Sequence, residues 1–113
     1  MADVRLSPQT LADTGITPSY TGSLLTTNTY KIRNDGRTFV HFKKSGASDC
    51  VVTIQTPKTV GGLAVAEQTV TVVATTGDKM IGPFQPSIYN DGAGDVNITL
   101  SEVTGLTVGV VSL

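Results

Sequence analysis

Several short segments of the chain place hydrophobic and polar side chains at alternate positions. The clearest are residues 51–54, 69–73 and 96–100, where valine, isoleucine or leucine recurs at every second position and threonine or asparagine fills most positions between. Because successive side chains of a β-strand point to opposite faces, this period of two predicts strands that bury one face. No helical period of comparable length accompanies it, so the pattern indicates an all-β fold.

Turn-forming residues separate these segments. The strongest turn signal is Asn34-Asp35-Gly36, because these residue types tolerate the positive φ angles of tight hairpin turns. We expect seven or eight strands between residues 29 and 113, in an antiparallel β-sandwich or barrel of jelly-roll-like arrangement. The main candidates for these strands are residues 30–33, 38–42, 51–54, 69–73, 96–100 and 106–111, and the remaining strands are expected among three shorter segments, 63–65, 79–81 and 87–89.

The first part of the chain lacks this alternation. Proline residues at positions 8 and 18 and a run rich in serine and threonine between residues 20 and 28 interrupt any regular pattern. We therefore interpret residues 1–28 as an extended N-terminal arm and residues 29–113 as the β-sandwich domain.

Spaced hydrophobic residues along the arm suggest that it packs on a neighbouring molecule, because a segment broken by proline cannot bury them by itself. A flexible tail is the alternative. If the arm is a contact element, deletion of residues 2–18 should leave a folded domain that associates more weakly. The candidate contact residues are Val4, Leu6, Leu11 and Ile16.

The charges are unevenly distributed along the 113 residues, which have the length of one domain and a formal net charge of −1. Residues 1–58 carry seven Lys or Arg and four acidic residues, whereas residues 59–113 carry one Lys and five acidic residues. We consider Lys31, Arg33 and Arg37 candidates for contact with an acidic partner or with another copy. Solvated strand faces are the alternative. The overall charge gives no expectation of nucleic-acid binding.

Residues able to support catalysis or metal binding are few. The one histidine is His41 and the one cysteine is Cys50, so an internal disulfide is impossible and the sequence signal of a zinc site is missing. Cys50 begins a predicted strand, where a buried and unreactive thiol is typical. Asp91 and Asp95 do not have the spacing of the twelve-residue calcium loop and favour a turn instead. We therefore expect no enzyme activity, metal, cofactor or small-molecule substrate.

The N-terminal sequence is polar and has no apolar stretch of the kind found in signal peptides. The longest apolar stretches are too short to span a bilayer. We expect synthesis in a cytoplasm without secretion, and no membrane partner.

Residues 34–113 resemble a family of small head-module proteins of tailed bacteriophages. The resemblance rests on strand-and-turn sequences rather than on catalytic motifs, and the first 28 residues take no part in it. The segments that carry it are residues 34–43 (NDGRTFVHFK), 62–72 (GLAVAEQTVTV), 81–84 (IGPF) and 87–90 (SIYN).

The resemblance implies a structural role in the virion. The form we favour is a decoration, or cement, protein on the outer capsid surface, with the major capsid protein as its partner and a homo-oligomer, preferably a trimer, as its state. Its location would be the virion, after synthesis in the host cytoplasm. The alternatives are a glycan- or receptor-binding β-sandwich of a phage tail or adhesin, and another head–tail component. The scarcity of aromatic residues makes the glycan-binding alternative weaker.

Overall fold

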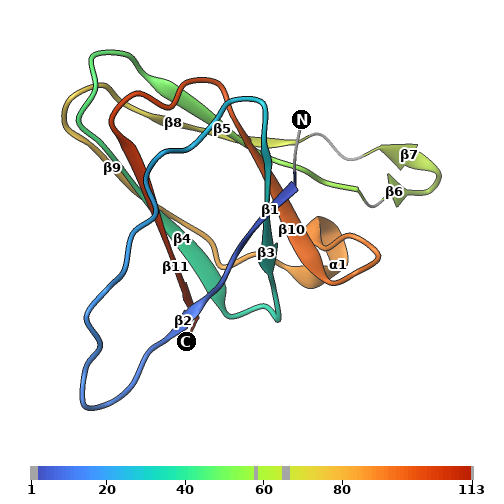
Figure 1. Ribbon diagram of the computed structural model, residues 1–113. Helices are drawn as coiled ribbons and strands as arrows, with labels where there is room; N and C mark the ends of the chain where they lie inside the picture. The colour runs from blue at the N-terminus through green and yellow to red at the C-terminus, as the bar shows by residue number, and fades with distance from the viewer. Residues whose placement is uncertain (1–2, 58, 65–66, 113) are drawn as a thin grey trace.

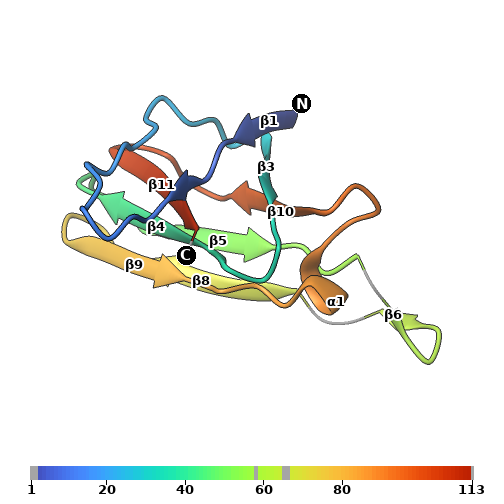
Figure 2. The ribbon, with the colours of Figure 1, turned by 90° about the horizontal axis from the view of Figure 1, so that it is seen from below.

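The computed structural model describes residues 3–57, 59–64 and 67–112. Within these residues the chain forms eleven strands and one short helix. Nine of the strands make up two β-sheets on either side of one hydrophobic core, and the other two form a separate hairpin (Figures 1 and 2). The fold is therefore nearly all β, and its two sheets are compatible with the predicted sandwich.

Sheet 1 consists of β1 (Asp3–Leu6), β3 (Thr29–Arg33), β10 (Asp95–Leu100), β5 (Cys50–Ile54) and β8 (Gln68–Val72), in the order β1-β3-β10-β5-β8. Strand β1 runs parallel to β3, whereas the other neighbours are antiparallel. The register places Leu6 and Val96 on either side of Ile32, so a row of apolar residues crosses this end of the sheet.

Sheet 2 consists of β2 (Gln9–Thr10), β11 (Leu106–Ser112), β4 (Thr38–Lys44) and β9 (Gly77–Ile81), in the order β2-β11-β4-β9. The long pair β4 and β11 is antiparallel and forms the centre of the sheet, with β9 along one edge. Strand β2 pairs with β11 in parallel. The two sheets are therefore mixed rather than purely antiparallel, because both N-terminal strands add in parallel at an edge.

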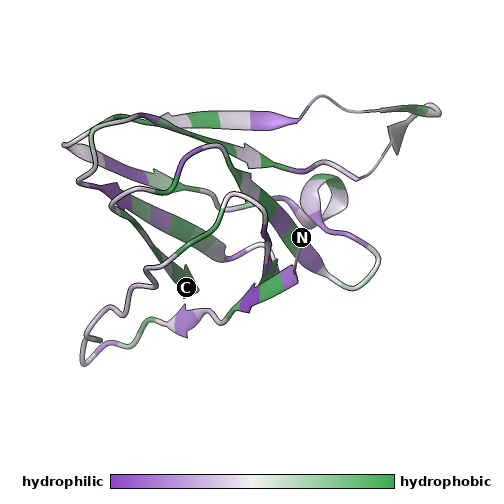
Figure 3. Cartoon of the chain, turned by 45° about the horizontal axis from the view of Figure 1, so that its top comes forward, coloured by the Kyte–Doolittle hydropathy of each residue, from purple (hydrophilic) through white to green (hydrophobic). Residues whose placement is uncertain are grey.

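The core lies between the sheets and is filled by alternate residues of their strands. Figure 3 shows this alternation as green bands that interrupt paler or purple ones along the strands. Cys50 is buried among these residues, which confirms the burial expected for its thiol. The core side chains of the long strands include Ile32, Val40, Phe42, Val52, Ile54, Val96, Ile98, Leu106, Val108 and Val110.

Two of the short segments expected to be strands of the sandwich differ from that prediction. Residues 87–89 belong to helix α1 (Pro86–Tyr89), a single turn. Proline has the backbone angle of a first helical turn and lacks an N–H, so Pro86 favours a turn over a ladder strand. Residues 63 and 64 form β7 (Leu63–Ala64), which pairs with β6 (Thr59–Val60) in a hairpin beyond the sandwich (Figure 1). Residue 65 lies outside the described residues.

The predicted N-terminal arm is not confirmed for the residues that form β1 and β2. These strands are edge strands of the two sheets of the same chain. Leu6 is only 7% exposed and belongs to the core, and Leu24 is buried there as well. The reason is that Val4 and Leu6 share the face of β1 that meets the core, so pairing with β3 buries Leu6 and partly buries Val4.

Candidate functional site

A loop between β2 and β3 lies against the outer face of sheet 2. Hydrogen bonds to β11 hold residues 11–21 of this loop at both ends: the Leu11 N–H donates to Ser112 O (2.9 Å), and Thr21 and Val108 exchange N–H···O bonds of 2.8 and 3.0 Å. The Gln9 side chain closes the loop, because its amide donates to Ser19 O (2.7 Å) and its oxygen accepts from Ser19 N–H (2.6 Å). The loop is therefore fixed to the sheet rather than free.

A groove of about 340 Å³ lies between this loop and sheet 2. We call it the sheet-2 groove. Its lining is mostly apolar, and two of its hydrophobic side chains are open to solvent: Met80 is 68% and Leu11 44% exposed. Apolar pockets with a few polar groups are typical binding sites, so this groove is the leading candidate. Its lining residues are Leu11, Ala12, Gly15, Ile16, Pro18, Tyr20, Phe39, His41, Met80 and Val111.

A chain of three polar side chains starts at Tyr20 and His41, which line the groove, and ends at Asp78 outside its lining. The Tyr20 hydroxyl lies 2.8 Å from His41 Nδ1, and His41 Nε2 contacts an Asp78 carboxylate oxygen. A neutral imidazole with its proton on Nε2 satisfies both contacts, with the hydroxyl donating to Nδ1. The hydrogen bond from His41 holds the pKa of the Asp78 carboxyl below its usual range. These polar groups are bonded to one another, so the groove offers an incoming ligand mainly apolar surface.

The Tyr20 ring fixes the loop to the sheet by close packing. It lies directly over Gly109 of β11, where an added Cβ atom would approach Tyr20 Cε2 to 2.9 Å. It meets His41 edge to face, with ring centroids 5.6 Å apart, and the Lys43 ammonium lies 5.1 Å from its centroid. A glycine within a strand often marks such a close approach, and Gly109 was the sequence signal that could have located this contact.

The structure separates the predicted apolar contact residues into two groups. Leu11 and Ile16 line the sheet-2 groove and remain accessible at the surface. Leu6 is part of the chain's own core, and Val4 packs against it. No pattern in the sequence pointed to Tyr20, Met80 or the other groove residues from β4 and β11, because the groove exists only once the loop lies on the sheet.

The predicted basic contact residues are also divided. The Lys31 ammonium donates to Asn97 Oδ1 (2.7 Å) and lies 3.3 Å from an Asp91 oxygen, so it is used within the chain. Arg33 donates to Ala93 O at 2.9 Å. Arg37 is exposed on the turn between β3 and β4, and its backbone N–H donates to the Asp35 carboxylate.

Two carboxylates organise the turn before β10. Asp91 accepts from Asn97 Nδ2 at 3.0 Å and from the N–H groups of Asp95 and Ala93, and these bonds hold the pKa of its carboxyl well below its usual range. Asp95 is 1% exposed, and its carboxylate accepts two hydrogen bonds from the Arg5 guanidinium, at 2.9 and 2.7 Å. The hydrogen bonds from Arg5 lower the pKa of the Asp95 carboxyl. The pair of aspartates thus closes a turn and attaches β1, as the turn interpretation of their spacing expects.

These lowered pKa values predict a loss of stability in acid. A carboxyl whose folded-state pKa lies below its unfolded value of about 3.9 stabilises the fold above that pH and loses this contribution as the pH falls below it. We expect Asp91→Asn to lower the free energy of unfolding at pH 7 by about 1–3 kcal/mol and to shrink the difference between pH 7 and pH 3. Urea denaturation at both pH values measures this, with the exposed Asp13→Asn as the control. Equal pH dependence in wild type and Asp91→Asn would contradict the assignment.

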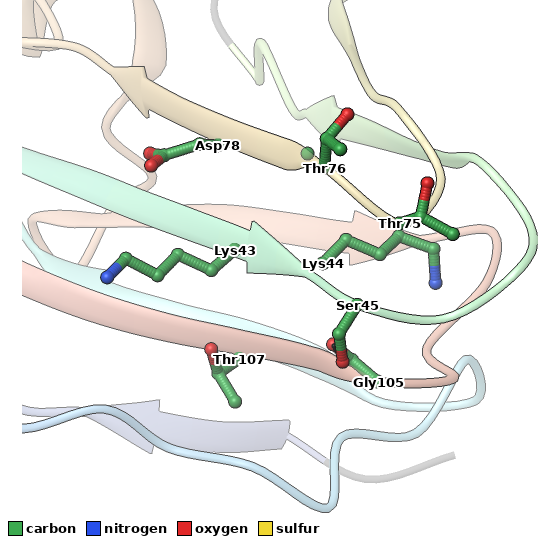
Figure 4. Close-up of a pocket in the computed structure, with 9 residues that line it drawn as sticks. Lys43, Lys44, Ser45, Thr75, Thr76, Asp78, Gly105 and Thr107 are labelled. Atoms are coloured by element: carbon green, nitrogen blue, oxygen red, sulfur yellow. Dashed lines mark hydrogen bonds between the residues drawn. The ribbon is translucent and has the colours of Figure 1, made fainter.

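A second, polar pocket of about 400 Å³ lies at the end of sheet 2, where three connecting loops meet (Figure 4). The side chains of Lys43 and Lys44 extend in opposite directions there. The Lys44 side chain is wholly buried; its ammonium donates to Thr104 O at 2.5 Å and lies 3.7 Å from a Glu102 oxygen. None of the nine described lining residues is aromatic, which does not favour a sugar site. They are Lys43, Lys44, Ser45, Thr75, Thr76, Gly77, Asp78, Gly105 and Thr107.

The hairpin formed by β6 and β7 carries a second exposed apolar feature. Its strands pair as Thr59 with Ala64 and Val60 with Leu63, around a Gly61-Gly62 turn. Leu63 is 74% exposed, the most open of the large hydrophobic side chains that the structure describes. Two adjacent glycines between Val60 and Leu63 are a sequence signal of such a hairpin.

Among the described residues, no group of three or more His, Cys, Asp or Glu side chains is arranged to hold a metal ion. No helix in that part of the chain is long and apolar enough to cross a membrane. No protein-family model matches the sequence, and neither a curated protein nor a solved structure is significantly similar to it. Function must therefore be inferred from the surfaces of the fold and from the sequence resemblance.

Proposed function

We propose that this chain is a non-enzymatic structural protein of a bacteriophage virion, and specifically a decoration protein that binds the outer surface of the capsid. Its partner is the major capsid protein. The resemblance of residues 34–113 to phage head-module proteins gives the class, and the surfaces of the fold support a role in joining neighbours.

The observation that carries the proposal is the position of two apolar features on one small sandwich. The loop between β2 and β3 lies at one end of the sandwich, and the β6–β7 hairpin extends from the other (Figures 1 and 2). The loop walls the sheet-2 groove, where Leu11 and Met80 are open to solvent, and the hairpin carries the exposed Leu63. A protein that strengthens a shell must contact more than one neighbour. A sandwich with one contact feature at each end meets that requirement.

We interpret the strand order as jelly-roll-like, an architecture common in viral capsid proteins. From β3 to β5 and from β8 to β11, each strand lies in the opposite sheet from the one before it. In this interpretation a further strand of sheet 2 would be expected between β5 and β8. The chain instead forms β6 and β7 there, which extend outward as a separate hairpin. Because one fold serves many functions, the architecture agrees with the proposal but is not the evidence on which the proposal rests.

The test is binding to capsids of the cognate phage that have been assembled without the protein. We expect the wild-type chain to co-sediment at a fixed ratio to the capsid protein and to raise the temperature at which the shells come apart. Arg37→Glu should weaken binding, because the exposed Arg37 guanidinium makes no hydrogen bond or ion pair with the described residues, unlike Lys31 and Arg33. Added salt should weaken wild-type binding too. Lys79→Glu, an exposed basic position outside residues 1–58, is the matched control. Failure of the wild type to bind shells, or binding to glycans instead, would refute the proposal.

A further inference from the structure

We propose that copies of this chain associate head to tail, with the hairpin tip of one copy seated in the sheet-2 groove of the next. Leu63 is the inserted side chain, and the groove wall formed by Leu11, Ile16 and Met80 receives it. The contact goes beyond capsid binding and does not depend on it, because it joins two copies of the same chain.

The turn of the β6–β7 hairpin fixes the position of its tip, where Leu63 is exposed. Gly61 and Gly62 have φ angles of 60° and 80°, the positive values that a tight two-residue turn requires. The turn therefore holds Leu63 in one place opposite Val60. A two-stranded hairpin of only two residue pairs is not stable in water by itself, so a partner that covers it would stabilise it. Its Leu63 side chain is at the same time the most exposed large hydrophobic group in the described part of the chain.

The groove has the chemistry that such a tip needs. Residues 59–64 carry no charged side chain, and the groove walls are mostly apolar. The polar atoms within the groove, from Tyr20 and His41, already bond to each other, so a neutral side chain leaves no buried polar group without a partner. The volume of about 340 Å³ accommodates a leucine side chain together with part of its backbone.

The strand beside the groove offers the backbone of the hairpin a second contact. Met80 belongs to β9, which is the edge strand of sheet 2. An edge strand presents unpaired N–H and C=O groups that can add a further strand. An incoming β6–β7 hairpin has free edges of its own, so it can bond to β9 while Leu63 enters the groove.

The positions of the two features require two copies. Figures 1 and 2 show the hairpin at one end of the molecule and the loop that walls the groove at the opposite end, and the molecule measures 41 Å along its longest axis. One chain therefore cannot place its own hairpin in its own groove. Joining unlike surfaces produces a ring when the rotation closes.

The first experiment measures self-association by sedimentation velocity over a range of concentrations. We expect the wild-type chain to associate and the exposed-site variants Leu63→Asp and Met80→Asp each to raise the dissociation constant about 10- to 100-fold, because each places a charge in an apolar contact. The control is Leu25→Asp, an exposed leucine outside both features. Circular dichroism and melting confirm that each variant is folded. A wild-type chain that stays monomeric at millimolar concentration, or variants that associate as the wild type does, would overturn the proposal.

Mixing the two variants tests the head-to-tail arrangement itself. Leu63→Asp keeps an intact groove and Met80→Asp keeps an intact hairpin, so an equimolar mixture should form a one-to-one dimer that cannot grow further. A symmetric interface of like surfaces predicts no such recovery. Oxidation of mixed Leu63→Cys and Met80→Cys chains should also give a covalent dimer that neither variant forms alone, since Cys50 is buried. If the groove variant loses only capsid binding while self-association persists, the groove accepts a capsid segment and the head-to-tail contact is wrong.

Discussion

Deletion of residues 2–10 is expected to destabilise the whole domain rather than to remove a passive tail. The deletion takes away β1 and β2 and uncovers the edges of β3 and β11. It removes Leu6 from the core and leaves the Asp95 carboxylate without its Arg5 partner. Only the Asp95 side of this ion pair is buried, and a buried carboxylate that loses its main charged partner is destabilising. Together with the loss of two strands and of Leu6, this should leave the truncated chain unfolded or partly folded at 25 °C.

A single substitution isolates the contribution of the core contact. We expect Leu6→Ala to lower the free energy of unfolding by about 2–4 kcal/mol, the cost of a cavity at a buried leucine. Leu11→Ala is the matched control, because Leu11 is on the rim of the groove and should change stability by less than about 0.5 kcal/mol. Urea denaturation gives both values. If the truncated chain and Leu6→Ala both unfold at the wild-type denaturant concentration, residues 1–28 behave in solution as the arm that the sequence suggested.

Gly109→Val is expected to release the loop from sheet 2 and to destroy the sheet-2 groove. A side chain at position 109 would occupy the place of the Tyr20 ring, and its Cβ atom alone would come within 2.9 Å of that ring. Overpacking of this kind costs about 1–3 kcal/mol. Because Tyr20 and its bond to His41 would move, the variant should also lose the self-association that we propose for the groove.

The double variant Gly109→Val with Tyr20→Ala separates crowding from other causes. When the ring is absent, the valine has room, so the stability cost of Gly109→Val should fall to within about 0.5 kcal/mol in the Tyr20→Ala background. Unfolding free energies of the four proteins give the coupling directly. An equal cost in both backgrounds would show that Gly109 is required for a reason other than its contact with Tyr20.

The sequence located most strands because their signal is local. Residues 96–100 alternate apolar and polar side chains, and this alone predicts a half-buried strand, which β10 confirms. The four residues of β1 are too few to show a period, and their partner β3 follows more than twenty residues later. The segment 87–89 is likewise too short for its pattern to distinguish a strand from a helical turn. Pro86, directly before it, favours the helical turn that the structure contains.

The candidate site depended on tertiary structure to a greater degree. The sequence by itself determined a small β domain, a buried Cys50 and a set of apolar residues near the N-terminus that needed to be covered. It could not separate Leu6, which the core covers, from Leu11, which lines the groove, since both are leucines in an irregular segment. That separation follows from which strand each segment meets, and such pairings join residues as far apart as Leu11 and Ser112. Contacts over these distances arise only when the whole chain has folded, because alternation specifies the face of a strand and not its neighbour.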